Sequence, residues 1–344
     1  MKLLMITRKI DKDDGLAGFT YNWVKKLSKN VDKLYVICLE KGNDSGLPDN
    51  VSVYSLGKEN GKNRWKEFWR FHKLARQIVP QVDGVFAHQN PEYGISIAPW
   101  TKLFRKKLIA WYVHGSVGTK LRLLNFLSDK MLSINKESFR LPSKKVIFLH
   151  HGIDTEIFYF KEKEIHDELR LLSVSRISAT KQIDKMIDLV ASIKSKTNKK
   201  VVLKIVGEAT LEKDKVFLNE QNNRIFKLNL KEEVKFLGSV SNTETPPLYQ
   251  WADIFLNFSK TGSVDKTVLE AMSSGTPVLV SNEAFRDILE PINKSMYINN
   301  LDKLGDKALV VADIGDASFL KDLHTYVDSH HSLDKLSKTI VSLF

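Results

Sequence analysis

Residues 259–280 read SKTGSVDKTVLEAMSSGTPVLV, and the order of residue types in this stretch decides the fold. An apolar run over 254–258 precedes it and predicts a buried strand that ends at a polar, glycine-containing loop. Asp265 has the residue type of an N-cap, Gly275 would end the helix that follows, and Pro277 prevents its continuation. Strand, loop, helix and strand in this order are typical of a parallel sheet, whose carboxyl edge binds ligands.

Glu270 is the unusual residue of this stretch because it lies between Leu269 and Ala271 in an otherwise apolar helical turn. A charge in such a place is costly unless a partner binds it. The residue is either a solvated helix residue or a carboxylate that accepts hydrogen bonds from the hydroxyl groups of a ligand. The local pattern leaves both interpretations open.

Length and composition indicate a globular protein with two domains. The chain has 344 residues, 42% hydrophobic and 27% charged, which is too long for one ordinary core. We expect domains over 1–160 and 161–330 and a C-terminal helix over 331–344. The single Cys38 excludes an internal disulfide and fits a reducing compartment. No apolar run approaches the roughly 20 residues of a membrane span, and the chain enters a strand directly, so we expect a cytoplasmic protein without a signal peptide.

Predicted strands alternate with helices along the whole chain, which indicates an α/β protein with two Rossmann-like parallel sheets. The strands of the first sheet are expected at Lys2–Thr7, Leu34–Leu39, Gly84–His88, Leu108–Val113, Met131–Ile134 and Val146–Leu149. Those of the second are expected at Leu169–Ser175, Val201–Val206, Val234–Leu237, Ile254–Phe258, Val278–Val280 and Met296–Ile298.

Two cations follow the first strand of the second domain. Arg176 and Lys181 lie after Leu169–Ser175 and just before a helix with apolar residues at 183, 186, 187 and 190. Fixed positive charge beside the free N–H groups of a helix start is a phosphate-binding arrangement. Two solvated surface cations are the alternative, and we favour the phosphate site because the Glu270 segment accompanies it.

The segment around Glu270 resembles the nucleotide-sugar loop of retaining GT-B glycosyltransferases of family 4. The strings LEAM at 269–272 and GTPV at 275–278 carry the resemblance, and Arg176 and Lys181 match the family's Arg-x4-Lys spacing. The resemblance implies that Glu270 holds the ribose hydroxyls of the donor and that the two cations hold its diphosphate. The family's other glutamate falls on Gly262, a departure that affects contacts to the transferred sugar. Our hypothesis is that the variant loop compensates, with donor contacts from Gly262, Ser263, Asp265, Lys266 and Thr267.

The resemblance also assigns roles in the rest of the chain. It implies two Rossmann-like domains facing across a cleft, with the last helix crossing back to the first domain. His114 would contact the transferred sugar and the reaction centre, and it positions or stabilises rather than attacks. The resemblance places Gly15 and Gly18 in a loop near the donor phosphates and the acceptor, and a purely structural turn is an equal alternative for that loop. It places Gly207 and Glu208 in a loop near the nucleotide base, where donor contacts usually come from the backbone, so the Glu208 side chain is either a donor contact or a bystander. His88, Gln89 and Asn90 follow a strand of the first sheet and are candidates for acceptor binding.

We expect no metal and no cofactor. Breaking a sugar–phosphate bond leaves negative charge on the diphosphate, and the resemblance implies that cationic side chains and a helix end stabilise this charge. The one Asp-x-Asp sequence, at 11–13, lies in a charged loop that we interpret as surface. The paired histidines at 150–151 and 330–331 lack further metal-ligand residues nearby in sequence.

Positive charge is concentrated in the first half of the chain. Residues 1–160 carry 27 Lys+Arg against 15 Asp+Glu, whereas residues 161–344 carry 26 of each. This asymmetry favours an anionic partner for the first domain. The helix predicted at 62–79 combines aromatic residues with cations, as interfacial helices do. We therefore predict peripheral contact with the anionic inner face of the membrane through Trp65, Trp69, Arg70, Lys102, Arg105, Lys106 and Lys107.

Together these features predict a retaining hexosyltransferase. It would move a sugar from a nucleotide-diphosphate sugar to the hydroxyl of a glycan or lipid-linked acceptor, in the synthesis of a cell-surface glycan or glycolipid. A nucleotide-sugar epimerase on the same fold is one alternative. A non-catalytic nucleotide-sugar-binding protein is another, favoured by Gly262. We expect no nucleic-acid partner, because no nucleic-acid motif accompanies the basic residues.

Overall fold

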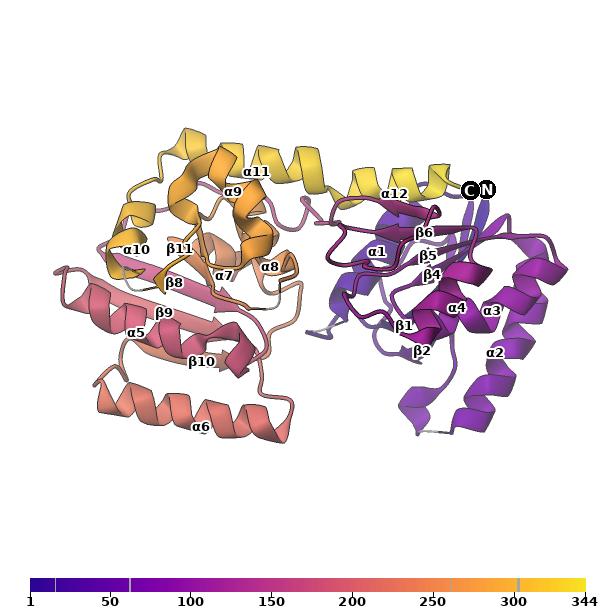
Figure 1. The fold of residues 1–344 in the computed structure, drawn as a ribbon, viewed down its shortest axis with the longest axis horizontal. Coiled ribbons are helices and arrows are strands. Elements are labelled where there is room, and N and C mark those ends of the chain that lie inside the picture. The colour runs from indigo at the N-terminus through magenta and orange to yellow at the C-terminus, as the bar shows by residue number, and fades with distance from the viewer. Residues whose placement is uncertain (16, 62, 261, 302–303) are drawn as a thin grey trace. The chain divides into compact units, whose positions relative to one another are not determined.

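The computed structural model describes residues 1–344 except 16, 62, 261 and 302–303. The chain divides into two compact units (Figure 1). The first comprises Met1–Asp154, Ser241–Thr243 and His331–Phe344, and the second comprises Thr155–Val240 and Glu244–His330. Each unit is an α/β structure with its own parallel sheet, as the sequence predicts. None of the helices in the described part of the chain has the length and apolar content that crossing a membrane requires.

The first unit contains a seven-stranded parallel sheet of order β3-β2-β1-β4-β5-β6-β7. Its central strands are continuous apolar runs because helices cover both faces of the sheet. The strands are β1 (Lys2–Ile10), β2 (Lys33–Lys41), β3 (Val51–Ser55), β4 (Gly84–His88), β5 (Lys107–Trp111), β6 (Lys130–Ser133) and β7 (Val146–Phe148).

Helices cover each face of this sheet. Apolar residues of α1 (Gly18–Ser28) and α12 (Leu333–Ser342) share one core cluster with the sheet. Those of α2 (Arg64–Ile78), α3 (Pro91–Leu103) and α4 (Thr119–Leu127) share another cluster. The three helices therefore form one layer, and short 3-10 turns lie at Lys58–Asn60 (η1) and Val79–Gln81 (η2) beside α2.

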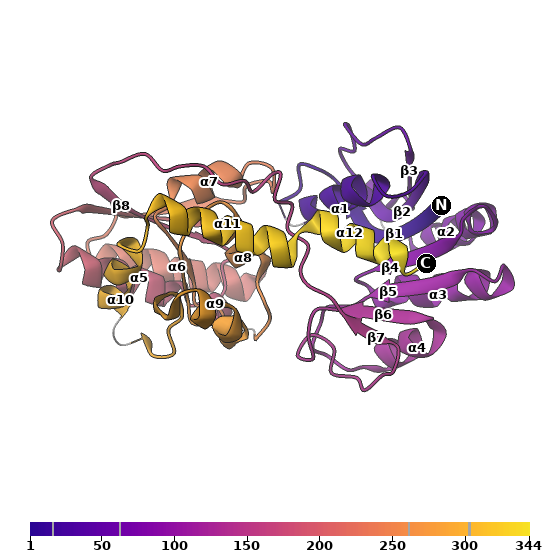
Figure 2. The same cartoon turned by 90° about the horizontal axis from the view of Figure 1, so that it is seen from above.

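The C-terminal helix is an integral part of the first unit. In both views α12 lies along α1, and the two chain ends are neighbours (Figures 1 and 2). Lys26 on α1 is 1% exposed, and its Nζ lies 3.1 Å from Asp154 Oδ1 and 2.6 Å from Asp334 Oδ2. A buried ammonium group needs such partners, so this cluster ties α12 to α1 and to the end of the first unit's main segment.

The second unit contains a five-stranded parallel sheet of order β10-β9-β8-β11-β12. Its strands are β8 (Glu168–Val174), β9 (Lys200–Val206), β10 (Val234–Gly238), β11 (Ile254–Asn257) and β12 (Val278–Val280). Its helices are α5 (Ile183–Lys194), α6 (Glu212–Lys227), α7 (Pro246–Trp251), α8 (Lys266–Ser273), α9 (Arg286–Asn293), α10 (Leu304–Ala312) and α11 (Ala317–His331). Short 3-10 turns are η3 (Ala179–Lys181), η4 (Glu283–Phe285) and η5 (Lys294–Met296).

Two strand assignments from sequence are corrected. The strand predicted at Met296–Ile298 is wrong: the segment begins as η5, whose N-cap Asn293 accepts a hydrogen bond from Ser295 N, and then makes one isolated bridge between Val280 and Tyr297. Conversely, β3 escaped prediction because it is a half-buried edge strand without a continuous apolar run.

Replacing Lys26 by methionine should destabilise the first unit. Asp154, which is 5% exposed, would lose its cation, and breaking a buried pair from one side costs about 3–5 kcal/mol. Urea unfolding followed by circular dichroism measures the change. The matched control is Lys25→Met on the exposed side of the same helix. Equal unfolding midpoints for the two variants would contradict the structural role of Lys26.

Candidate active site

The strands of the second sheet all run parallel, so their carboxyl ends lie at one edge, where open α/β sheets bind ligands. Arg176 and Lys181 follow β8, and Gly207 and Glu208 follow β9. The loop before α8 follows β11. Residues that are far apart in the sequence therefore meet at one edge of one sheet.

Lys181 is fixed in position by the loop that precedes α8. It lies at the end of η3 and is 9% exposed. Its Nζ donates to Asp265 Oδ2 at 2.9 Å and to Ser259 Oγ at 3.2 Å. Asn257 Nδ2 donates to the same Asp265 oxygen at 2.9 Å. A backbone bond from Lys260 N to Thr180 O further joins the two loops.

Arg176 differs from Lys181 in its surroundings. It is exposed, and its guanidinium group makes no hydrogen bond or ion pair with any residue that the structure describes. The edge therefore offers one cation that is already oriented and another that is available to an anion.

Asp265 occupies the N-cap position of α8, as predicted, but its side chain makes no capping hydrogen bond. The reason is that Lys181 and Asn257 already bind its carboxylate. The structure thus assigns Asp265 a different role from the one its residue type indicates: it holds Lys181 rather than the end of the helix.

Glu270 lies on α8 and is 7% exposed, so the interpretation as a solvated residue is wrong. The Tyr249 hydroxyl donates to Glu270 Oε2 at 2.8 Å. One turn earlier on α8 lies Lys266, which is half-buried. Burial lowers the pKa of Lys266 to about 8, against the opposing effect of the Glu270 charge.

The glycines at this edge have distinct geometries. Gly207 has φ +136°, and a Cβ there would lie 1.8 Å from the Ser175 carbonyl oxygen, so no other residue fits between the ends of β8 and β9. Gly262 has φ +65°, a left-handed conformation that favours glycine. A Cβ at Gly262 would have no described atom within 4 Å.

A cavity of about 350 Å³ opens beside Gly262. Ser263 lies near it, and its carbonyl oxygen accepts a hydrogen bond from Asn282 Nδ2 at 2.7 Å. Thr267 is half-buried on the first turn of α8. The cavity is lined by Gln182, Ser259, Lys260, Gly262, Ser281, Asn282, Glu283, Asn299 and Leu301.

The carboxyl edge of the first sheet holds a second cavity, of about 580 Å³. Gln89, Asn90 and His114 contribute to its lining, together with residues of α4. His114 is held by a bond from its backbone N to Ser138 O, and its Nδ1 accepts from Ser116 N at 3.2 Å. The structure thus brings together three of the predicted residues of the first domain.

His88 does not line this cavity. It is 1% exposed, its Nδ1 lies 3.2 Å from Thr7 Oγ1, and its ring packs 4.7 Å from that of Trp23. This packing places His88 in the core of the first unit, whereas the sequence grouped it with acceptor-binding residues.

The loop containing Gly15 and Gly18 is organised by Lys9, whose Nζ binds Asp14 at 2.6 Å and Asp11 at 3.1 Å. Burial opposes the charge of Lys9, but these hydrogen bonds raise its pKa above the usual value. Gly15 is exposed and Gly18 begins α1. Within the described residues, no group of three or more His, Cys, Asp or Glu side chains is placed to hold a metal ion.

Sequence reasoning missed several polar partners of the predicted residues in the second unit. Tyr249, Asn257 and Ser259 contact the predicted residues directly. Asn257 was included in an apolar strand run, and Tyr249 gave no signal because its spacing to Glu270 follows no local period. The roles of the predicted residues stay predictions, although their positions are now known.

Comparison with known proteins supports the same fold and family. Residues 154–290 match the family described as Glycosyl transferases group 1. A segment of 160 residues is 26% identical to mannosylfructose-phosphate synthase of Agrobacterium fabrum, covering 44% of this chain and 35% of that protein. A segment of 118 residues is 32% identical to alpha-monoglucosyldiacylglycerol synthase of Streptococcus pneumoniae, covering 34% of this chain and 25% of that protein. The matched segments thus span only about a third or less of these two relatives' length.

Solved structures match the whole chain. The crystal structure of Anabaena HepE in complex with UDP superposes with a TM-score of 0.75 at 16% identity, over 100% of this chain and 99% of that one. The UDP-glucose complex of the same protein gives 0.72 at 17% identity and the same coverage. The chain therefore has the GT-B fold of two Rossmann-like units, and within its second unit the match is to the family of glycosyl transferases group 1.

Proposed function

We propose that this protein is a retaining, metal-independent glycosyltransferase that moves a hexose-type sugar from a nucleotide-diphosphate sugar to an acceptor hydroxyl. The observation that carries the proposal is the bond from Lys181, which follows β8, to Asp265 at the start of the helix that carries Glu270, with Arg176 exposed after the same strand. The family match of residues 154–290 and the UDP-bound structures of a protein with the same fold support it.

The two cations would stabilise the leaving diphosphate. Lys181 has three N–H donors, of which Asp265 and Ser259 take two. The third remains for a phosphate oxygen, and Arg176 offers a free fork of donors suited to the same group. Because Lys181 is already oriented, little reorganisation is needed when charge develops on the phosphate.

The first unit would bind the acceptor in the cavity lined by Gln89, Asn90 and His114. His114 would orient the acceptor or the transferred sugar. We assign no protein nucleophile, and propose that the acceptor hydroxyl reacts on the face of the sugar that the phosphate leaves. An NMR spectrum showing a product with inverted anomeric configuration would contradict retention.

Gly262 favours a second candidate, a nucleotide-sugar-binding protein without catalysis. Gly262 has no side chain, so it cannot make the contact with the transferred sugar that the resemblance implies for a glutamate at this position. A Cβ built at Gly262 would have no described atom within 4 Å. Asp265, which lies three residues further on and binds Lys181, could compensate by holding the loop in one conformation. Donor consumption measured with and without candidate acceptors, such as diacylglycerol lipids and oligosaccharides, separates the two functions.

We further propose peripheral contact with an anionic, cytoplasmic membrane face through the layer of α2, α3 and α4, with a glycan or lipid-linked acceptor. Trp65 and Trp69 are 75% and 66% exposed. All five cations of α2 are exposed, and the helix has a single acid. Exposed indoles beside cations are features of interfacial helices. The α2 cations are Arg64, Lys66, Arg70, Lys73 and Arg76.

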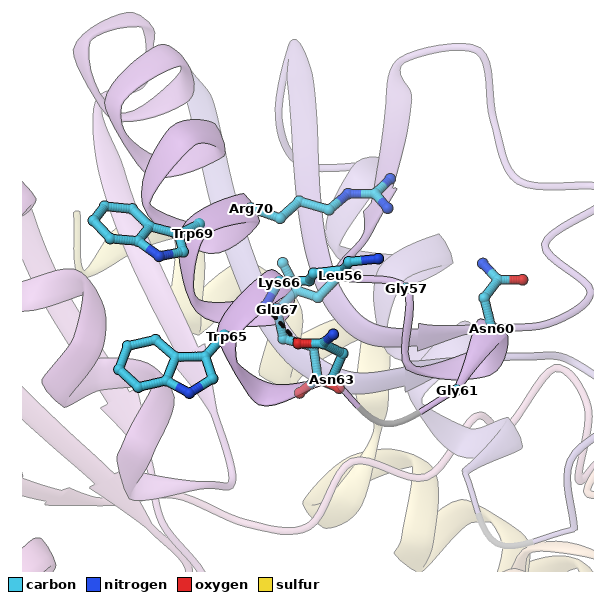
Figure 3. Close-up of a pocket in the computed structure, with 10 residues that line it drawn as sticks. All are labelled: Leu56, Gly57, Asn60, Gly61, Asn63, Trp65, Lys66, Glu67, Trp69 and Arg70. Carbon is cyan, nitrogen blue, oxygen red and sulfur yellow. Dashed lines mark hydrogen bonds between the residues drawn. The ribbon is translucent and has the colours of Figure 1, made fainter.

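The beginning of α2 also borders a cavity of about 750 Å³, large enough for a headgroup. Figure 3 shows Trp65 and Trp69 projecting to the same side of the helix, while Lys66 and Arg70 extend toward the loop at Gly57. The cavity is lined by Leu56, Gly57, Asn60, Gly61, Asn63, Trp65, Lys66, Glu67, Trp69 and Arg70.

The second predicted basic set lies elsewhere on this layer. Lys102, Arg105 and Lys106 lie at or just after the end of α3, close to the start of β5, whereas the indoles are near the start of α2. Parallel βα units place these helix ends at opposite edges of the sheet, about 20 Å apart for a helix of this length. Lys107 is removed from the proposed surface because its Nζ donates to the carbonyl oxygens of Leu343 and Phe344.

Substituting either of the two cations proposed to bind the diphosphate should remove turnover, and Arg176→Ala should do so with the fold intact because Arg176 is exposed. Lys181→Ala or Arg176→Ala should each lower kcat by about 10²–10³, because each removes one contact to the developing charge. The matched control is Lys227→Ala, an exposed cation in the last turn of α6, at the end of that helix away from the carboxyl edge. Initial rates with the donor selected by a thermal-shift screen provide the measurement. A Lys181→Ala enzyme with near-normal turnover would remove the phosphate assignment.

The two indoles should control vesicle binding. Trp65→Ala with Trp69→Ala should weaken co-sedimentation with anionic vesicles at least about tenfold, since each large apolar side chain contributes about 1.5–3 kcal/mol when buried. Phe226→Ala, which removes a 67% exposed aromatic residue of the second unit, serves as control. Neutral vesicles should bind the wild type less than anionic ones. Unchanged pelleting of the double variant would exclude this surface.

A further inference from the structure

Tyr249 is a buried hydroxyl group that the proposed function does not use. The residue lies on α7, is 0% exposed, and donates to Glu270 Oε2 at 2.8 Å. Its ring packs against those of Phe158 and Phe255, at centroid distances of 5.7 and 5.6 Å. Its carbonyl oxygen accepts from Thr276 Oγ1 at 2.6 Å. Ring and backbone are therefore both fixed, and the hydroxyl has one direction in which to point.

The hydroxyl is not needed to fill space. Phenylalanine would occupy the same volume, and burying a polar group is unfavourable unless it is hydrogen-bonded. Burial, together with the charge of Glu270, raises the pKa of Tyr249 well above its usual value, so the phenol stays a donor at any physiological pH. A carboxylate has about four acceptor positions, so the single bond from Tyr249 orients the group without using its whole accepting capacity.

We propose that Tyr249 is a positioning residue, which holds the Glu270 carboxylate for hydrogen bonds from the vicinal hydroxyl groups of a nucleotide ribose. The inference rests on the proposed function, because it takes Glu270 as the group that contacts the ribose. Two features set Tyr249 apart from an ordinary core residue. Its hydroxyl donates a hydrogen bond to a charged group, and such a hydrogen bond is about twice as strong as one between neutral groups. The same hydrogen bond joins α7 to α8.

Two ligands that differ only in the ribose test the proposal. Isothermal titration calorimetry would compare UDP with 2′,3′-dideoxyuridine diphosphate on the wild type, Tyr249→Phe, Glu270→Gln and the double variant. Tyr249→Phe should weaken UDP about tenfold, within the range of a lost bond to a charged group. It should leave the dideoxy ligand unchanged. In the Glu270→Gln background the tyrosine substitution should have little further effect, because the two residues act as one unit.

The outcomes separate this inference from the proposed function. If Glu270→Gln weakens UDP but Tyr249→Phe does not, the positioning role is overturned and the ribose contact stands. If Tyr249→Phe weakens both ligands equally, the residue acts through general structure and the inference is also overturned. If Glu270→Gln leaves UDP binding unchanged, or the wild type prefers neither nucleotide, the ribose contact of the proposed function fails. The ratio of the dissociation constants for UDP and the dideoxy ligand is measured on the same protein sample, so an unfolded fraction of a variant affects both ligands equally.

Discussion

One buried ammonium group joins the two loops on which the candidate site is built. Lys181 follows β8, whereas Asp265 and Ser259 follow β11, and the three are joined by bonds from the Lys181 Nζ. A charge that is 9% exposed is stable only where partners surround it. The loop before α8 must therefore adopt the conformation that supplies these partners. A ligand that reaches this edge meets a cation whose position is set by the protein itself, which is the condition for electrostatic preorganisation.

The same kind of contact recurs where other remote segments meet. Lys26 joins α1 to α12 through Asp334 and so makes the C-terminal helix part of the first unit. Glu270 joins α8 to α7 through Tyr249. In each case a charge on one element is enclosed by another element far along the chain. Apolar packing holds the layers together, while these polar contacts select one relative placement of the helices and loops.

The glycine at position 262 has a consequence for the shape of the cavity beside it. Because the backbone is left-handed there and no described atom lies near the position of a Cβ, the cavity beside it is bounded by backbone and by neighbours such as Asn282. The loop conformation depends on Asp265 instead, which accepts hydrogen bonds from two side chains. The shape of this cavity therefore depends on the loop conformation and on its neighbours rather than on a side chain at position 262.

The sequence by itself determined the α/β order, nearly all strands, and the candidate residues Arg176, Lys181 and Glu270. It did so because buried parallel strands are continuous apolar runs, and because a charge that interrupts an apolar pattern is visible locally. Only the tertiary structure decided the partners. Lys181 and Asp265 are 84 residues apart, and Tyr249 and Glu270 are 21 apart. No local period relates such pairs, so the burial of Glu270, the role of Asp265 and the place of His88 in the core follow from how the strands are ordered in each sheet.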